Sequence, residues 1–381
     1  MRRRDFVAYG SAAALSAAFV KLQAEQQADA AIPVLNLELH MEEIFEEMID
    51  GEVLYAMAFR DPVTRALRPP LRMRHGQTVN IKLVNKTRKP RRFAITGYAA
   101  NAFPLIPSGS TTTISFVASW PGSYIYHDNS EGPVGRVVGL HGPLVITAGA
   151  NCKTANGSYT PYHASKLTPE VCALFDALGT PHRFPGQKWR HDLPERERIW
   201  MLGEVDPAIN NAAELLIPIN LDVPAYFFRP RYFTLNNLSG YDAAHDEATV
   251  PKGYIGEPML LRVMNVGFCT HAPHIHGNHV FCVSNSYDLA GEAGGKNYCY
   301  SNVLELDTWL MKPLARKDVI LPFEKPQEIP HEVWPPREEP FPLLYPMHCH
   351  IEMSQTARGG QYPQGMVTHW ELLGVNRGVA V

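Results

Sequence analysis

The sequence predicts an all-β protein built from two copies of one sandwich-like unit. Short runs of Val, Ile, Leu, Phe and Thr are separated by turn residues, with 28 Gly and 32 Pro in 381 residues. This punctuation is typical of strands and turns rather than of helices. The chain also repeats itself, because residues 76–85 (GQTVNIKLVN) align without a gap with residues 256–265 (GEPMLLRVMN). With 45% hydrophobic and 19% charged residues, the chain is globular and long enough for about two domains.

Residues 1–30 are predicted to form a signal peptide of the twin-arginine type. Arg3-Arg4 precedes an Ala-rich apolar run that ends near Val20 and is short for a bilayer span. Ala28-Asp29-Ala30 offers a small-residue cleavage site. We therefore expect a periplasmic or otherwise exported protein without membrane contact after cleavage. A short membrane anchor that stays attached is the alternative interpretation.

The internal repeat continues through two later segments. Residues 107–119 match residues 313–323, and residues 122–129 match residues 344–350. Two copies of one structural unit explain these matches better than chance does.

The repeat predicts one domain over residues 31–150 and a second over residues 196–381. The segment between them, residues 151–195, is polar, contains Pro and Gly, and is interpreted as a linker. One short helix is expected there over Leu167–Leu178, starting at Thr168-Pro169.

The net charge of −3 gives no basic stripe, which argues against nucleic acid as a partner. The six cysteines allow two disulfides in an oxidising compartment, Cys152 with Cys172 and Cys282 with Cys299, although sequence does not fix the connectivity. Cys269 is left over, either as a small buried hydrophobe or as a competitor for one of these pairings.

The stretch His348-Cys349-His350 is the strongest chemical signal in the chain. Successive strand residues point to opposite faces, so His348 and His350 share one face and Cys349 takes the other. One short strand can therefore offer a thiolate to one metal and two imidazoles to a second metal site.

A second histidine motif lies upstream, at His271-Ala-Pro-His274-Ile-His276. His274 and His276 share a face by the period of two, while His271 precedes them in a loop. Thiolate with imidazole is the ligand set of blue copper, and clustered imidazoles suit copper or zinc. A lone His-x-His occurs by chance, but the two motifs together indicate a metal centre.

The two motifs resemble the last two copper motifs of the multicopper oxidases, the laccase-like family, which read His-x-x-His-x-His and then His-Cys-His. The resemblance extends more weakly along most of the chain after the leader. It implies two cupredoxin-like Greek-key domains of the β-sandwich or barrel type, with copper as the cofactor. It also implies which residues bind the metal: His271, Cys349 and Met366 for a blue copper, and His274, His276, His348 and His350 for an adjoining cluster.

The first copy lacks most of the histidines that the family places there. The first position reads residues 92–97 (RFAITG), and the second, His127-Asp128-Asn129, keeps only His127. His141 lies where the family has a variable residue, so we interpret it as structural. The chain thus offers four imidazoles to the cluster, or five with His127, which is fewer than a complete cluster needs.

The blue-copper site is altered as well. Ser354 stands where the family places a second histidine after the cysteine, and Met366 is the expected weak axial ligand. Met353, Met366 and His369 are the nearby candidates to replace the lost imidazole. A thioether is soft enough for Cu(I), and such a site is expected to differ in potential and colour from that of a laccase.

The resemblance implies an exported copper-binding oxidoreductase that couples one-electron oxidation of a substrate to dioxygen reduction, with an incomplete or atypical cluster. A small molecule, a metal ion or a protein would be the electron donor. Two-domain members often form trimers, so a homotrimer is expected as one arrangement, with His127 completing a site in another subunit. The alternatives are a copper electron-transfer protein without oxidase activity and a metal-free cupredoxin scaffold. No separate catalytic residue is predicted.

Overall fold

A computed structural model describes residues 32–98, 102–148, 152–178, 194–219, 228–286, 298–326, 328–330, 332–334 and 340–375. The predicted signal peptide lies outside these residues. Within them, none of the helices has the length and apolar character needed to cross a bilayer.

The first half of the chain forms two β-sheets. A four-stranded sheet has the order β2-β1-β4-β7, and a five-stranded sheet has the order β3-β9-β8-β5-β6. The strands are β1 Leu35–Glu47, β2 Val53–Arg60, β3 Leu71–Arg74, β4 Thr78–Asn85, β5 Arg91–Ile95, β6 Leu105–Ile106, β7 Thr111–Val117, β8 Gly122–Asp128 and β9 His141–Thr147.

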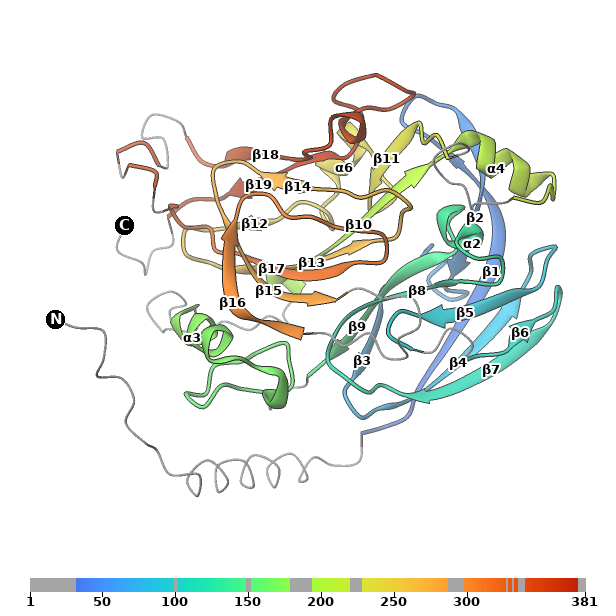
Figure 1. Cartoon of the computed structure of the whole chain (residues 1–381), viewed down its shortest axis with the longest axis horizontal. Coiled ribbons are helices and arrows are strands. Elements are labelled where there is room, and N and C mark those ends of the chain that lie inside the picture. The colour runs from blue at the N-terminus through green and yellow to red at the C-terminus, as the bar shows by residue number, and fades with distance from the viewer. Residues whose placement is uncertain are drawn as a thin grey trace.

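The second half forms another pair of sheets, which lies beside the first pair in Figure 1. A six-stranded sheet has the order β11-β10-β13-β17-β15-β16, and a four-stranded sheet has the order β12-β19-β18-β14. The strands are β10 Glu197–Val205, β11 Tyr232–Leu235, β12 Lys252–Gly253, β13 Met259–Asn265, β14 Pro273–Ile275, β15 Val280–Ser286, β16 Tyr298–Leu306, β17 Arg316–Leu321, β18 Leu343–Cys349 and β19 Val367–Leu372.

Helices are short and connect or cover these sheets. The α-helices are α2 Val134–Val137, α3 Pro169–Leu178, α4 Pro207–Glu214 and α6 Gly240–His245, and the 3-10 helices are η1 Ala164–Lys166, η2 Pro194–Arg196 and η3 Glu352–Gln355. The all-β prediction is confirmed, and so is the helix expected in the linker, since α3 begins at Pro169 behind a hydrogen bond from Val171 N to Thr168 Oγ1 (3.3 Å).

The two halves repeat each other down to single hydrogen bonds. β4 and β13 each pair in parallel with the first strand of their half, and their antiparallel partners are β7 and β17, respectively. Asn85 closes the end of β4 by donating its amide to the carbonyls of Lys89 and Ile106, and Asn265 does the same at the end of β13 toward Cys269 and Met311.

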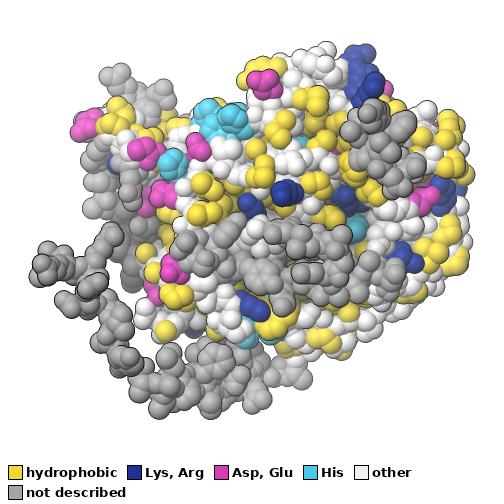
Figure 2. Space-filling model, viewed as in Figure 1, with side chains coloured by type: hydrophobic (Ala, Val, Ile, Leu, Met, Phe, Trp, Pro, Cys, Tyr) yellow, Lys and Arg dark blue, Asp and Glu magenta, His cyan; other side chains and the backbone are white. Residues whose placement is uncertain are grey.

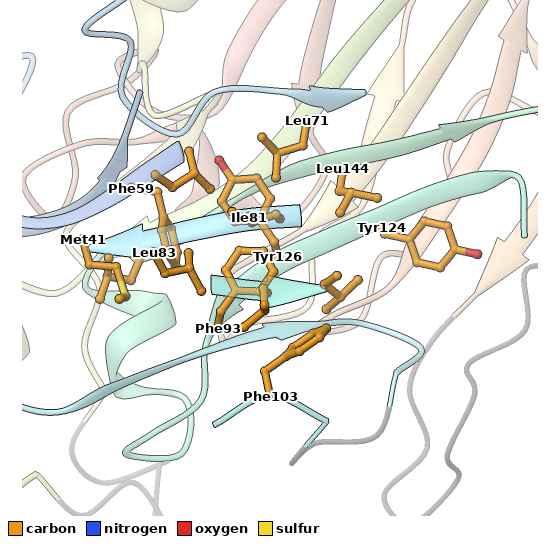
Figure 3. Close-up of a cluster of buried hydrophobic side chains, with 14 of the residues drawn as sticks. Met41, Phe59, Leu71, Ile81, Leu83, Phe93, Phe103, Tyr124, Tyr126 and Leu144 are labelled. Atoms are coloured by element: carbon orange, nitrogen blue, oxygen red, sulfur yellow. The ribbon is translucent and has the colours of Figure 1, made fainter. Parts of the chain in front are cut away.

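The core of each half lies between its two sheets. In the first half, side chains of β1 and β4 meet those of β8 and β9 from the facing sheet (Figure 3). Phe93 and Tyr126 are fully buried and stack with ring centroids 5.6 Å apart. Burying one such aromatic side chain stabilises the fold by about 2 kcal/mol. Each sheet is therefore oriented with the apolar face of its alternating strands toward the core.

The expected disulfide between Cys152 and Cys172 is not formed. The described cysteines are free thiols, namely Cys152, Cys172, Cys269, Cys282 and Cys349. Cys152 instead donates its thiol to the carbonyl of Ala148, while Cys172 lies on α3. The partner expected for Cys282, the side chain of Cys299, lies outside the described residues.

A buried network of charges joins the two halves. Arg262 on β13 is fully buried and donates to Glu197 (2.5 Å) and Asp318 (3.1 Å). Asp318 also accepts hydrogen bonds from Ser123 of the first half (2.5 Å) and from Tyr162 of the linker segment (2.8 Å). Three parts of the chain thus meet at one guanidinium–carboxylate group, which we call the Arg262 network.

The Arg262 network makes stability depend on pH. Burial alone would raise the pKa of Glu197, but the charges of Arg262 and Arg72 outweigh it and hold the pKa below its ordinary value of 4.5. A lowered carboxyl pKa contributes stability above the ordinary value and loses it as the pH falls toward the lowered one. Urea unfolding between pH 7 and 3 should therefore show a loss of free energy below about pH 4.5 that is smaller in Glu197→Gln.

Candidate metal centre

Strands β14 and β18 bring the two histidine motifs together. They pair antiparallel with His274 opposite His348 and Pro273 opposite Cys349. His276 N donates to the carbonyl of Pro346 (2.9 Å), which extends the pairing beyond β14. Strand alternation then places four imidazoles on one face and the cysteine on the other.

The four imidazoles of His274, His276, His348 and His350 form a group that we call the histidine quartet. Five of its six ring pairs have centroids 4.5 to 5.9 Å apart. Ligand nitrogens of His274, His276 and His348 all lie within 4.8 Å of one another. The group opens to the surface, and Figure 2 shows histidine side chains gathered on the face above β14 and β18.

The electrostatics of the quartet favour the neutral form at two of its rings. Burial, followed by the neighbouring imidazoles, lowers the pKa of His274 and of His276. Neutral imidazole is the form that binds a metal. Nδ1 of His274 is buried without a hydrogen-bond partner, and Nε2 of His276 lies 3.1 Å from Nε2 of His348. The unpaired ring nitrogen of His274 and the facing nitrogens of His276 and His348 suit a shared metal ion.

The thiol of Cys349 faces the interior on the opposite side of β18. Its Sγ lies 3.6 Å from Nδ1 of His271, and Oγ of Ser354 lies 3.4 Å from the same nitrogen. These three residues and Met366 are buried, with at most 2% of any of them exposed. We call this group the thiolate pocket.

Ser354 therefore occupies the place beside His271 where the resemblance expects an imidazole. Of the three candidates to replace that imidazole, Met353 is 56% exposed and Nε2 of His369 is engaged with Glu371 (3.1 Å). Met366 lies in the same buried cluster as Cys349, and its carbonyl accepts the Cys349 N–H (3.1 Å). Met366 is thus the candidate that the fold keeps inside the thiolate pocket.

The thiolate pocket also prepares its sulfur for a metal. Burial alone would raise the pKa of the Cys349 thiol, but the hydrogen bond and charge of His271 lower it. Burial alone would lower the pKa of His271, but Cys349 and Glu204 raise it to about 9. The lowered pKa shifts the Cys349 thiol toward the thiolate, which is the form that binds copper.

In the first half, other residues stand at the positions that correspond to the histidine quartet. β5 and β8 pair with Ala94 opposite His127, as His274 lies opposite His348 in the second half. By the same register Thr96 and Asn129 stand at the positions of His276 and His350. Thr96 Oγ1 accepts the backbone N–H of Ile125 (2.9 Å), so this position has a structural role.

A buried ion pair stands where the second half has its thiolate pocket. Arg91 takes the position of His271 and Asp128 that of Cys349, and Nη1 of Arg91 donates to Oδ2 of Asp128 (3.1 Å). His127 is the one imidazole retained, and its Nδ1 lies 3.2 Å from the carbonyl of Asp128. Within the described part of one chain, no ring contact joins His127 to the histidine quartet.

Two carboxylates at the metal centre were not predicted from the sequence. Oε1 of Glu204, on β10, lies 2.5 Å from Nε2 of His271, and Oδ2 of Asp307 lies 3.5 Å from Nε2 of His274. Glu204 precedes His271 by 67 residues, and neither carboxylate belongs to a short motif. Sequence offers no local signal for them, because parallel pairing of β10 with β13 and the packing of the following loop bring Glu204 to the site.

Comparisons with known proteins agree with this geometry. A family model described as multicopper oxidase matches residues 64–151. No curated protein matches the sequence. The blue copper oxidase from Nitrosomonas europaea is similar in structure, with a TM-score of 0.62 and 18% identity over 89% of this chain and 86% of that one.

Two further solved structures share the fold. The multicopper oxidase mgLAC has a TM-score of 0.61 and 17% identity over 92% of this chain and 88% of its own. The copper nitrite reductase from Nitrosomonas europaea has a TM-score of 0.54 and 15% identity over 89% and 94%. The predicted cupredoxin-like fold and the resemblance to the multicopper oxidases are confirmed, at the level of a domain in the first half and of the fold throughout.

Copper is the cofactor that this domain and fold imply, and the donor set fits it. The thiolate pocket offers a soft sulfur and an imidazole nitrogen 3.6 Å apart, and the quartet offers four clustered imidazoles. Sulfur with imidazole suits copper, whereas a hard cation such as magnesium prefers oxygen ligands.

Proposed function

Because the chain carries a multicopper oxidase domain and has the fold of these oxidases, we propose that it is an exported copper-binding oxidoreductase. It takes single electrons from a donor and passes them toward dioxygen, with an incomplete or atypical cluster. The observation that carries this proposal is the order of residues at the end of β18, where Cys349 of the thiolate pocket lies between His348 and His350 of the quartet.

In this proposal, residues on the two faces of β18 bind different metal sites. Cys349 and His271 hold one copper, with Met366 as a weak third ligand, and the histidine quartet holds copper on the other face. Copper, when bound, supplies one-electron redox chemistry. The backbone between Cys349 and its two neighbours is the shortest covalent connection between the two sites. Asp307, with Oδ2 3.5 Å from Nε2 of His274, would offset part of the positive charge of a bound copper.

The wider arrangement is part of the same proposal. The domains span residues 31–150 and 196–381 with a linker between them, and residues 1–30 direct export to the periplasm. The electron donor is a small molecule, a metal ion or a protein. A homotrimer would let His127 of one subunit approach the exposed face of the quartet of another, which lacks imidazoles from its own first half.

Electron transfer without oxygen reduction is the second candidate function. It is favoured by the first half, where Ala94, Thr96 and Asn129 stand at imidazole positions and the Arg91–Asp128 pair fills the place of the thiolate pocket. Both functions require copper at Cys349. A metal-free scaffold has no such observation in its favour, because the second half keeps Cys349, His271 and the histidine quartet.

Oxygen uptake separates the two functions. We expect the isolated monomer to show weak or absent turnover with phenolic donors, because too few imidazoles hold copper for four-electron reduction of dioxygen. The measurement compares monomeric and oligomeric fractions with an intact laccase at matched copper content. Laccase-like rates in the monomer would contradict this expectation, and copper-loaded protein without uptake in any fraction would favour electron transfer.

The quartet should bind its metal independently of the thiolate pocket. The double variant His274→Ala/His276→Ala removes both imidazoles of β14 and leaves the Cys349 strand unchanged. We expect fewer coppers per chain, measured by elemental analysis, with the thiolate charge-transfer band retained. His279→Ala is the matched control, since His279 lies just beyond this motif and contacts Glu328 (2.9 Å). Unchanged copper content in the double variant would remove the quartet as a metal site.

A further inference from the structure

Glu204 is a carboxylate enclosed by one loop of the second half. Its side chain has no exposed surface. It accepts backbone N–H groups from Phe268 (2.8 Å) and Cys269 (3.0 Å), and its Oε1 lies 2.5 Å from Nε2 of His271. A Cβ at Gly267 would lie 2.0 Å from Glu204 Oε2, so the loop approaches this closely only with glycine there.

The same loop is fixed from the other half of the chain. Arg136 of α2 is buried and donates Nη1 to the carbonyls of Val266 and Gly267, both at 2.5 Å. The guanidinium thus binds the loop carbonyls while Glu204 binds the loop N–H groups. Burying an isolated carboxylate costs several kcal/mol, so Glu204 needs these hydrogen-bond donors. A buried carboxylate at this position indicates a role at His271.

The contact determines which nitrogen of His271 faces the sulfur. Because Nε2–H donates to Glu204, Nδ1 lies toward Cys349 Sγ (3.6 Å). Histidines that bind a metal commonly donate their other ring N–H to a carboxylate or a carbonyl, which fixes the ring and makes it a better donor. Ser354 offers no second imidazole on that side, so the orientation of one ring determines the nitrogen ligation of the thiolate pocket.

We propose that Glu204 is the positioning residue of the thiolate pocket: it holds the His271 ring with Nδ1 directed at the metal position beside Cys349. This inference rests on the proposed function, in which Cys349 and His271 share a copper. It assigns to β10 a role that the copper motifs do not include, and it makes the loop over residues 266–270 part of the site.

The test compares Glu204→Ala and Glu204→Gln with Asp206→Asn. Asp206 is a matched control because it is a buried carboxylate at the end of the same strand that accepts two backbone N–H groups, from Ala208 (2.9 Å) and Arg229 (2.6 Å). Three readouts are taken: the free energy of unfolding without copper, copper(II) affinity with the thiolate charge-transfer band, and the copper-free crystal structure.

If Glu204 positions His271, Glu204→Ala weakens copper binding at the thiolate pocket by about 10- to 100-fold and shifts the band. Its copper-free crystal structure shows the His271 ring turned away from Cys349. Glu204→Gln, which keeps one acceptor oxygen, restores part of the affinity. Asp206→Asn lowers stability while the affinity, the band and the ring stay as in the parent protein.

Two results would overturn the inference. One is a His271 ring that stays beside Cys349 in copper-free Glu204→Ala. The other is a loss of stability in Glu204→Ala with unchanged affinity and band, which is what a purely structural carboxylate gives. A parent protein that shows no thiolate band with copper(II) instead refutes the proposed function, and the ring orientation in the copper-free crystals still decides the role of Glu204.

Discussion

Replacing Cys349 by Ser abolishes the intense visible charge-transfer band expected of the copper-loaded protein. The band arises from a thiolate–copper bond, and a serine hydroxyl is a hard, weakly acidic ligand that holds copper poorly. Cys349 is the described cysteine that lies beside an imidazole nitrogen, with Sγ 3.6 Å from His271 Nδ1. Optical and spin-resonance spectra of the copper-loaded parent and variant measure the effect.

Cys282→Ser is the control for this experiment. Cys282 is a fully buried free thiol of the same half, on β15, and burial raises its pKa to about 11, so it stays a thiol. We expect it to keep the band. A parent protein without any band would show that copper does not bind at Cys349, and a band that survives Cys349→Ser would place the sulfur ligand elsewhere.

Replacing Arg262 by Met has the largest expected effect on stability. The variant leaves Asp318 buried at 1% side-chain exposure without a guanidinium, and leaves Glu197, at 3%, with Arg72 as its remaining partner. Removing one partner of a buried ion pair costs about 3–5 kcal/mol, since the remaining charge stays desolvated. Urea unfolding monitored by tryptophan fluorescence gives the free-energy change, and the midpoint should fall without loss of the native fold in buffer.

A surface pair provides the comparison. Lys82 and Glu38 lie 3.3 Å apart with half of the lysine side chain exposed, so Lys82→Ala should leave the free energy of unfolding nearly unchanged. The double variant Arg262→Met/Asp318→Leu should cost less than the sum of its single changes, because it leaves fewer unpaired buried charges. An Arg262→Met variant as stable as Lys82→Ala would mean that the Arg262 network does not hold the halves together.

Most structural features that could be predicted from the sequence were predicted from strand periodicity. The period of two placed His348 and His350 on one face and Cys349 on the other, and the register of β14 with β18 has that arrangement. The repeat of the segment at residue 76 in the segment at residue 256 predicted matching strands. Both inferences rely on local patterns, which a single sequence contains.

Contacts between distant segments could not be predicted in the same way. Glu204 reaches His271 through the pairing of β10 with β13, and Arg262 meets Ser123 across 139 residues. No local pattern marks either contact. The disulfide expected between Cys152 and Cys172 was wrong for a related reason, because spacing in sequence does not determine whether two thiols face each other.

The Arg262 network also limits how this gene can be dissected. A truncated gene encoding residues 196–381 alone would retain every ligand of the thiolate pocket and the quartet. Its product would lack Ser123, which binds Asp318, and Arg136, which binds the loop beneath His271. In the excised half, water would reach the Arg262 network, and the loop that positions the His271 imidazole would lose its contact with Arg136. The first half therefore supports the copper site of the second half through Ser123 and Arg136, and we expect a minimal copper module to require both halves.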